Sequence, residues 1–186
     1  ERDLDAILTS PSYDSINGGF HRYSVNQDWS EPHFEKMLYT QANMIRILSK
    51  IYSLTRNNRY LYAMQQTITM GEVFFSNTWG YSSAISAFSD GNEGVYYQYS
   101  DLSVDSTPTA KHLLNTGSSD DILLYDRLQL INFKYNNHNK LISLRRLDGD
   151  WRDSMEFATL SKIRSVKKPP NIDEKVIVSW NSAYAI

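Results

Sequence analysis

Apolar residues recur with a helical period through the middle of this chain of 186 residues. From residue 30 onwards they return every three or four positions, as on one face of an amphipathic helix. This stripe consists of Phe34, Met37, Leu38, Ile45, Leu48 and Tyr52. Ser30 is a favourable N-cap, and Glu31 and Pro32 suit a first helical turn. The pattern predicts a helix that begins at Ser30 and ends at the paired asparagines 57–58.

A second helical stretch follows this break. Its predicted inner face carries Leu61, Met64, Ile68 and Phe75. Two helices of similar length joined by a short polar turn form an αα-hairpin, which we therefore expect here. Further helices are predicted for residues 1–9, 107–114 and 120–131, for about 150–164 with Asp150 as cap, and from Asp173 to the last residue.

Other stretches have the period of two that is typical of strands. Residues 20–25 (FHRYSV) alternate and predict a short extended piece. The runs SSAISAF and VYYQYS flank the turn sequence SDGNEG and predict a β-hairpin, and another extended pair is expected around residues 136–137. The sequence therefore predicts a mainly α fold of helical hairpins with small β-hairpin excursions.

Composition is typical of a single globular domain over residues 1–186, with 41% hydrophobic and 22% charged residues. The net charge of −2 argues against a nucleic-acid partner, and no apolar run approaches the length of a membrane span. The chain has no cysteine, which excludes disulfides, redox thiols and thiolate zinc sites. Its 13 Tyr, 7 Phe and 4 Trp suit either a half-wet sugar cleft or an ordinary small core. For the compartment, the cytoplasm is favoured.

Two of the four histidines lie close together and are the first candidates for chemistry. In the first turn of the predicted helix, His33 would meet the positive end of the helix dipole, which favours a neutral imidazole and a general base. The alternative is a ring that only hydrogen-bonds a loop carbonyl. Alternation places His21 and Arg22 on opposite faces of the extended piece. Arg22 suits an anionic group, or else an ion pair with Glu31 or Glu35.

A metal site can be built on paper from His21, His33 and Glu35, since two histidines and a carboxylate suit iron or zinc. On the predicted helix, however, His33 and Glu35 are two positions apart and point about 200° away from each other. We therefore expect no metal and no cofactor. Glu35 and Lys36 are expected to form ion pairs at the surface or between helices.

Three segments spread along the chain resemble one known family. They are GGFHRYSVNQDWSEPHFEKMLY, SAISAFSDGNEGVYYQY and RSVKKPPNIDEKVIVSWNSAYAI. In this order they resemble the signature segments of the YyaL and spermatogenesis-associated family of thioredoxin-domain-containing proteins. The family has the acidic run D-A-D-S where this chain has Ser86, Ala87, Phe88 and Ser89. The turn residues Gly91, Glu93 and Gly94 are retained.

The resemblance implies an α/α toroid like that of the N-acylglucosamine 2-epimerases and six-hairpin glycosidases. We expect this chain to hold an incomplete part of that ring, without the family's thioredoxin-like domain. The implied chemistry is proton transfer on a small sugar, with His33 as base, His21 as a second acid or base and Arg22 binding the anionic intermediate. The matching motif positions imply substrate contacts from Glu35, Asp173, Lys175, Trp180 and Asn181. Asp173 can instead cap the last helix, and Trp180 can belong to the core.

Two other functions remain open at this stage. Loss of the acidic run at residues 86–89 favours a non-catalytic sugar-binding or protein-interaction module. An incomplete ring could also be a structural segment that associates with itself or with a partner to cover its open side.

Overall fold

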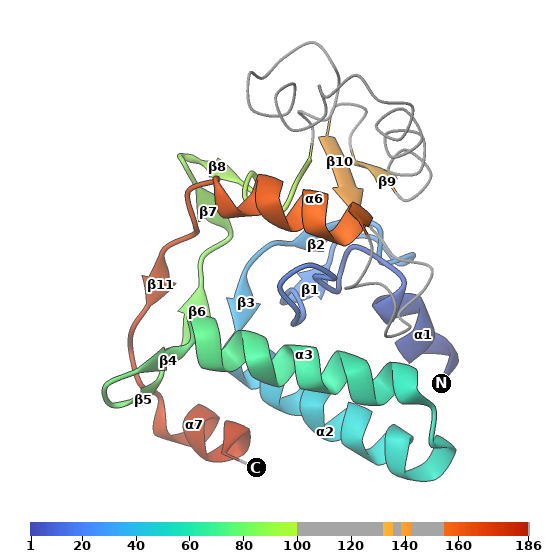
Figure 1. The fold of residues 1–186 in the computed structure, drawn as a ribbon. Coiled ribbons are helices and arrows are strands. Elements are labelled where there is room, and N and C mark those ends of the chain that lie inside the picture. The colour runs from blue at the N-terminus through green and yellow to red at the C-terminus, as the bar shows by residue number, and fades with distance from the viewer. Residues whose placement is uncertain (100–131, 136–138, 143–154, 186) are drawn as a thin grey trace.

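The computed structural model describes residues 1–99, 132–135, 139–142 and 155–185. Two antiparallel helices, α2 (Leu38–Thr55) and α3 (Asn58–Phe74), form its base (Figure 1). Arg56 ends α2 with a left-handed backbone, φ 55°. Asn57 then caps α3, because its side-chain oxygen accepts a hydrogen bond of 3.1 Å from the Arg59 amide. The αα-hairpin and its turn are confirmed.

The start of the first long helix was predicted wrongly. Instead of helix, the chain forms β2 (Pro32–His33) and β3 (Lys36–Met37), and α2 begins only at Leu38. Burial alternates residue by residue from 32 to 36, which is the period of a strand. In addition, a residue that precedes proline, here Glu31, is driven out of the helical region of backbone space. His33 is therefore a strand residue and receives nothing from a helix dipole.

The strands pair in short antiparallel ladders. The predicted extended piece is confirmed as β1 (Tyr23–Ser24), which pairs with β2 so that Tyr23 lies opposite His33. Strand β6 (Ala84–Ile85) lies between β3 and β11 (Ile172–Asp173). The last helix, α7 (Val178–Tyr184), consequently begins later than the predicted Asp173, whose carbonyl accepts the Ser83 amide at 3.0 Å instead.

Two predicted hairpins are present. Strands β7 (Phe88–Ser89) and β8 (Asn92–Glu93) pair around Asp90 and Gly91, which have φ of 51° and 81°. The hairpin is shorter than predicted, because residues 95–97 form turns instead of a strand. The pair β9 (Asn132–Tyr135) and β10 (Asn139–Ile142) is confirmed, and β4 (Ser76–Asn77) with β5 (Gly80–Tyr81) adds a further one.

The predicted helix at the start of the chain is α1 (Arg2–Leu8), and the one before the paired prolines is α6 (Met155–Ser165). The helices expected at 107–114 and 120–131, and the cap at Asp150, lie outside the described residues. Within the described residues, no helix is long and apolar enough to cross a membrane. Helices with small antiparallel strand pairs agree with the mainly α prediction, and the toroid stays a prediction.

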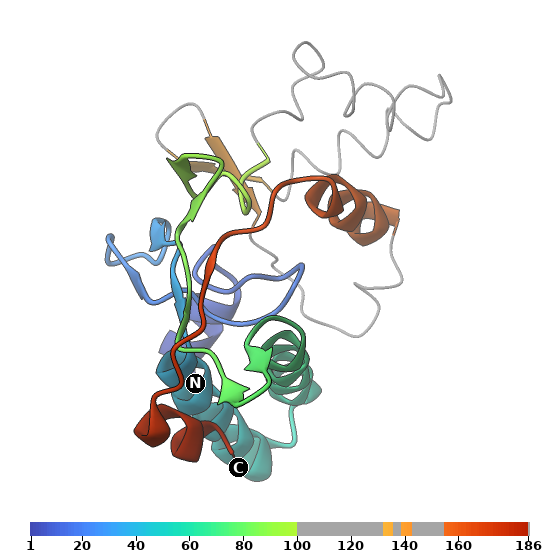
Figure 2. The same cartoon turned by 90° about the vertical axis from the view of Figure 1, so that its left-hand side faces the viewer.

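The N-terminal segment, residues 1–20, lies between α6 and the helical hairpin of α2 and α3 (Figures 1 and 2). One core cluster joins these three parts and contains Leu4, Leu8, Tyr13, Ile16, Phe20, Leu48, Tyr60, Ala63, Tyr99 and Leu160. A second cluster fills the space between α2, α3 and α7. Gln41 connects α2 to the N-terminal segment, because its side-chain amide exchanges two hydrogen bonds of 2.8 Å with the backbone of Phe20.

The inner face of α3 differs from the predicted one. Its buried residues are Tyr60, Ala63, Thr67, Met70 and Gly71. Of the predicted inner residues, Phe75 is buried, Leu61 and Met64 are half-buried, and Ile68 is 39% exposed. Gly71 leaves room for α7, because a Cβ added to it would lie 1.7 Å from the Tyr184 hydroxyl.

Candidate functional site

The β1–β2 hairpin brings several candidate side chains together at the surface. Tyr23 and His33 face each other across the ladder, and their rings stack with centroids 4.9 Å apart and planes 20° apart. Glu35 lies two residues after His33, so it falls on the same side of an extended chain. The Glu35 carboxylate oxygen Oε2 lies 3.8 Å from His33 Nε2. The predicted separation of these two side chains by a helix was therefore wrong.

Glu93 completes this group from β8. Its Oε1 lies 2.8 Å from His33 Nδ1, a hydrogen-bond distance. We call Arg22, Tyr23, His33, Glu35 and Glu93 the His33 cluster. The side chains of His33 and Glu35 are about a quarter exposed, and those of Arg22 and Glu93 about 40%. The His33 cluster is thus open to solvent, with one ring nitrogen held by a carboxylate and the other too far from Glu35 for a hydrogen bond.

Arg22 forms the predicted ion pair, with Nη1 at 2.9 Å from Glu35 Oε2. Hydrogen bonds from Arg22 to the Tyr39 hydroxyl and to Glu35 raise the pKa of its guanidinium. The group therefore carries its full charge across the physiological range. A guanidinium has five N–H donors, so the pair with Glu35 leaves donors for another partner.

His21 lies apart from the His33 cluster. It is 5% exposed and its Nδ1 contacts the Phe34 carbonyl at 3.0 Å. Burial, together with the nearby Lys36 ammonium, lowers the pKa of His21 to about 3. His21 is therefore neutral at physiological pH, with Nδ1–H donating to Phe34. The predicted opposite faces of His21 and Arg22 are confirmed, since one points into the core and the other to solvent.

Beside His21, three charged side chains form a buried ion network, defined as Asp14, Lys36 and Arg164. Lys36 Nζ lies 2.8 Å from Asp14 Oδ2 and 2.8 Å from the Gly18 carbonyl, and Arg164 Nη1 lies 2.5 Å from Asp14 Oδ1. All three side chains are at most 5% exposed. Lys36 thus forms an ion pair as predicted, but the pair is buried and joins β3 to Asp14, neither at the surface nor between two helices.

The buried ion network shifts the titration of its own members. Burial by itself raises the pKa of Asp14, but Arg164 and Lys36 outweigh this and hold that pKa far below its usual value. Burial lowers the pKa of Lys36. A cavity of about 10 Å³, near the least that holds one water molecule, borders the network. Its lining includes Asp14, His21, Tyr97 and Arg164, and all four of these residues are buried.

The four candidates near the C-terminus also have structural contacts. Asp173 Oδ2 accepts a bond of 3.0 Å from Lys175 Nζ, and both side chains are exposed. Trp180 packs against the second core cluster and meets the Tyr39 ring edge-on, with centroids 4.9 Å apart. Asn181 exchanges two hydrogen bonds, of 2.8 and 2.9 Å, with the backbone of Tyr81. Trp180 is linked to the His33 cluster through Tyr39, whose side chain is hydrogen-bonded to Arg22.

The tract that carries the acidic run in the resembled family has structural partners here. Ser86 Oγ accepts the Phe88 amide at 3.0 Å, and Ser89 donates to the Lys168 carbonyl. Glu93, at the end of the same tract, was assigned only to a turn. Its place before Gly94 in the retained motif was the one signal for it. Within the described residues, no group of three His, Asp or Glu side chains is arranged to hold a metal ion.

Comparison with known proteins gives local similarity. No family model matches the chain. It is 42% identical to uncharacterized protein B0495.5 of Caenorhabditis elegans over 55 residues, which cover 30% of this chain and 8% of that protein. It is 45% identical to human spermatogenesis-associated protein 20, and 40% identical to the mouse protein, over 47 residues, a quarter of this chain and 6% of each relative. These matches support the resemblance to spermatogenesis-associated protein 20, over less than a tenth of each relative's length.

Proposed function

We propose that the His33 cluster is an acid–base site that moves a proton next to the carbonyl group of a sugar, as in isomerase- or epimerase-type reactions. The observation that carries the proposal is the contact of 2.8 Å between Glu93 Oε1 and His33 Nδ1. A carboxylate in this position holds the proton on Nδ1 and leaves Nε2 with a free lone pair. His33 Nε2 is then the general base.

Arg22 has the second role in this proposal. Loss of a proton beside a carbonyl group produces an enediolate, whose negative oxygen needs a fixed positive partner. Arg22 is charged, accessible and tied to the same hairpin through Glu35. Its remaining N–H groups are the donors for that oxygen. His21 has no role in this scheme because it is buried and neutral.

The sugar as substrate class has weaker support than the proton transfer. It rests on the resemblance of the three motif segments and on the position of Tyr23. Tyr23 is 51% exposed and lies directly beside the base. Its ring offers an apolar surface with a polar tip, which suits the mixed surface of a sugar.

A non-catalytic sugar-binding or interaction module is the second candidate. One observation favours it: Arg22 is paired with Glu35 and His33 with Glu93, as in an ion-pair network that only joins two hairpins. Residues 86–89 also offer no carboxylate for a second acid or base. In this second candidate, the His33 cluster binds a ligand without converting it chemically.

Isothermal titration with a panel of aldoses, ketoses and N-acetylated hexosamines separates the candidates. The catalytic proposal expects binding by the wild-type protein, conversion of the bound sugar on incubation, and loss of conversion with retained binding in His33→Gln. Binding without conversion leaves the second candidate alone. If the folded protein binds no sugar in the panel, the catalytic proposal and the sugar-binding module both fail, and an interaction module is left. Glu174→Gln, a change at an exposed residue that has no role in either candidate, is the matched control.

A further inference from the structure

Helix α2 has apolar side chains outside its core face that the described fold buries only in part, and one of them, Ile51, also packs against the first core cluster. The inner side of α2 supplies Leu38, Ala42, Ile45 and Leu48 to the core. On the opposite side, Ile47 is 49% exposed and Leu54 70%, with half-buried Ile51 between them. Positions 47, 51 and 54 are spaced by four and three residues, so their side chains form one continuous stripe.

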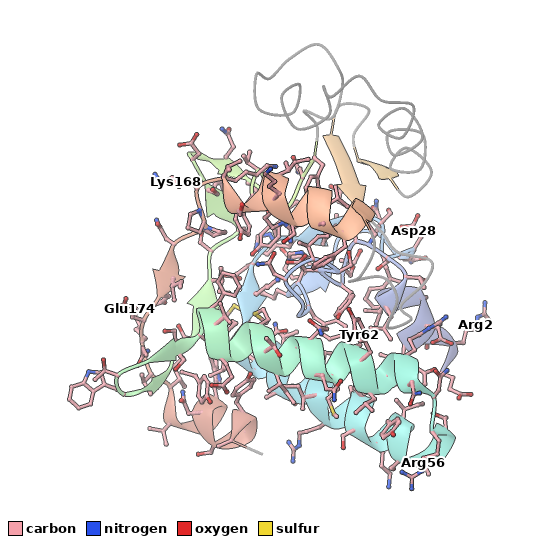
Figure 3. The ribbon with its side chains drawn as sticks, in the orientation of Figure 1. Arg2, Asp28, Arg56, Tyr62, Lys168 and Glu174 are labelled. Carbon is pink, nitrogen blue, oxygen red and sulfur yellow. The ribbon has the colours of Figure 1, made fainter. Side chains whose placement is uncertain are left out.

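The charges beside this stripe all have the same sign. Arg46 and Lys50 are four residues apart on the helix, next in sequence to Ile47 and Ile51. Arg56 follows at the end of the helix (Figure 3). Helix α2 contains no Asp or Glu. Within the described part of the chain, no carboxylate forms an ion pair with Arg46 or Lys50. The stripe defined by Ile47, Ile51 and Leu54 is therefore an apolar surface with a basic border, which we call the α2 stripe.

We propose that the α2 stripe docks an amphipathic helix whose apolar face is bordered by acidic residues. Apolar side chains spaced by four and three residues on one helix can pack against a partner helix whose apolar side chains have the same spacing. The basic border selects the charge of that partner, because opposite charges steer and orient docking while like charges oppose it. A second copy of α2 would place Arg46 and Lys50 against the same cations. A membrane surface would need a wider apolar face with Trp or Phe, which this side of α2 lacks.

Two synthetic peptides of 18 residues provide the probe. Both carry Leu with the spacing of the α2 stripe, and one has Glu and the other Lys at the bordering positions. Binding is followed by fluorescence anisotropy, and its position by NMR shifts of the α2 amides. We expect the Glu peptide to bind with shifts confined to α2, and the Lys peptide to bind about tenfold more weakly or not at all.

Protein variants then test each half of the surface. Ile47→Ser/Leu54→Ser should abolish binding, whereas Val73→Ser, a 67% exposed position on α3, should leave it unchanged. Arg46→Glu/Lys50→Glu should reverse the preference toward the Lys peptide. Circular dichroism checks the folding of each variant. Binding of the Lys peptide by Arg46→Glu/Lys50→Glu would also show that this variant is folded.

Four results would overturn the proposal. They are equal binding of the two peptides, a charge reversal that leaves the preference unchanged, self-association by sedimentation that is lost in Ile47→Ser/Leu54→Ser, and binding to phosphatidylserine vesicles without binding to the Glu peptide. The third would assign the α2 stripe to a second copy, and the fourth to a lipid surface.

Discussion

Glu93 and His33 are 60 positions apart in the chain and meet at 2.8 Å between Oε1 and Nδ1. This contact joins the β1–β2 hairpin to the β7–β8 hairpin at the surface. Because the carboxylate only accepts, the ring nitrogen that faces it is the donor of this hydrogen bond. The proposed base, Nε2, thus owes its free lone pair to a residue from the other hairpin.

Replacing Glu93 by leucine should change the tautomer of His33. In the wild-type protein we expect the Nδ1–H form, identified by the ¹⁵N shifts of the imidazole at pH 8. In Glu93→Leu the ring loses the acceptor on Nδ1, and the Nε2–H form should appear. Glu174→Leu, at an exposed position, is the control and should leave the spectrum unchanged. A wild-type ring that is already Nε2–H would contradict the assigned base.

Lowering the pH should destabilise the protein through His21. Its pKa is about 3 in the folded state and 6.5 in the unfolded chain. Between these values the unfolded chain takes up a proton that the folded protein refuses, so the free energy of unfolding falls as the pH falls from 6.5 toward 3. The slope contributed by this group is about 1.4 kcal/mol per pH unit.

His21→Asn isolates this contribution in urea unfolding between pH 7 and 4.5. The asparagine amide can still donate to the Phe34 carbonyl but does not titrate. The variant should show a flatter pH dependence than the wild-type protein. Asp14, whose pKa is lowered, adds its own loss only below its unfolded value of 3.8, outside this range. Equal slopes in both proteins would show that His21 is accessible to protons in the folded state.

Asp14 should matter more to stability than Lys36. Asp14→Asn leaves two buried cations without an anion and should cost about 5 kcal/mol of unfolding free energy. Lys36→Met keeps the pair between Asp14 and Arg164 and should cost about 3 kcal/mol. The exposed pair of Lys175 with Asp173 serves as the control, and Lys175→Met should change nothing measurable. Urea midpoints give the order, and a smaller loss for Asp14→Asn would be inconsistent with the buried ion network.

Gly94 should be required for the position of β8. It has φ 74°, and an added Cβ would lie 2.4 Å from the Phe34 ring. Gly94→Ala should therefore cost about 1–3 kcal/mol and break the contact between Glu93 and His33. Gly91→Ala has a similar backbone, φ 81°, but no atom within 4 Å of its added Cβ. It should cost about 1 kcal/mol and keep that contact, which the His33 ¹⁵N shifts report.

The parts of the fold that follow from local chemistry were predictable. Asn57 caps a helix with its own side chain, so the turn of the αα-hairpin is visible in the sequence. Period-two alternation likewise separated His21 from Arg22. The start of α2 was not predictable in the same way, because Ser30 and Pro32 suit a helix as well as an extended chain. The extended conformation is stabilised by the pairing of residues 32–33 with Tyr23–Ser24, which comes from another part of the sequence.

The charged residues show where local reasoning ends. Lys36 is buried because Asp14, 22 positions away, meets it in the core and pairs there with Arg164 as well. The residues next to Lys36 in the sequence do not predict its contact with Asp14. Glu93 was visible only as part of a turn, since its partner His33 comes from a distant hairpin. The structure brings the candidates Arg22, His33 and Glu35 together, but Glu93, which contacts His33, was missed.

If His33 removes a proton from a carbon atom of the sugar, that carbon should exchange its hydrogen with solvent. Aldoses, ketoses and N-acetylated hexosamines are incubated with the protein in D₂O, and ¹H NMR follows the C–H next to the carbonyl group. We expect exchange by the wild-type protein, a loss of at least about 100-fold in His33→Gln and normal exchange in the control Glu174→Gln. Folded wild-type protein that exchanges no sugar in the panel, or His33→Gln that exchanges as fast as wild type, would contradict this role of His33.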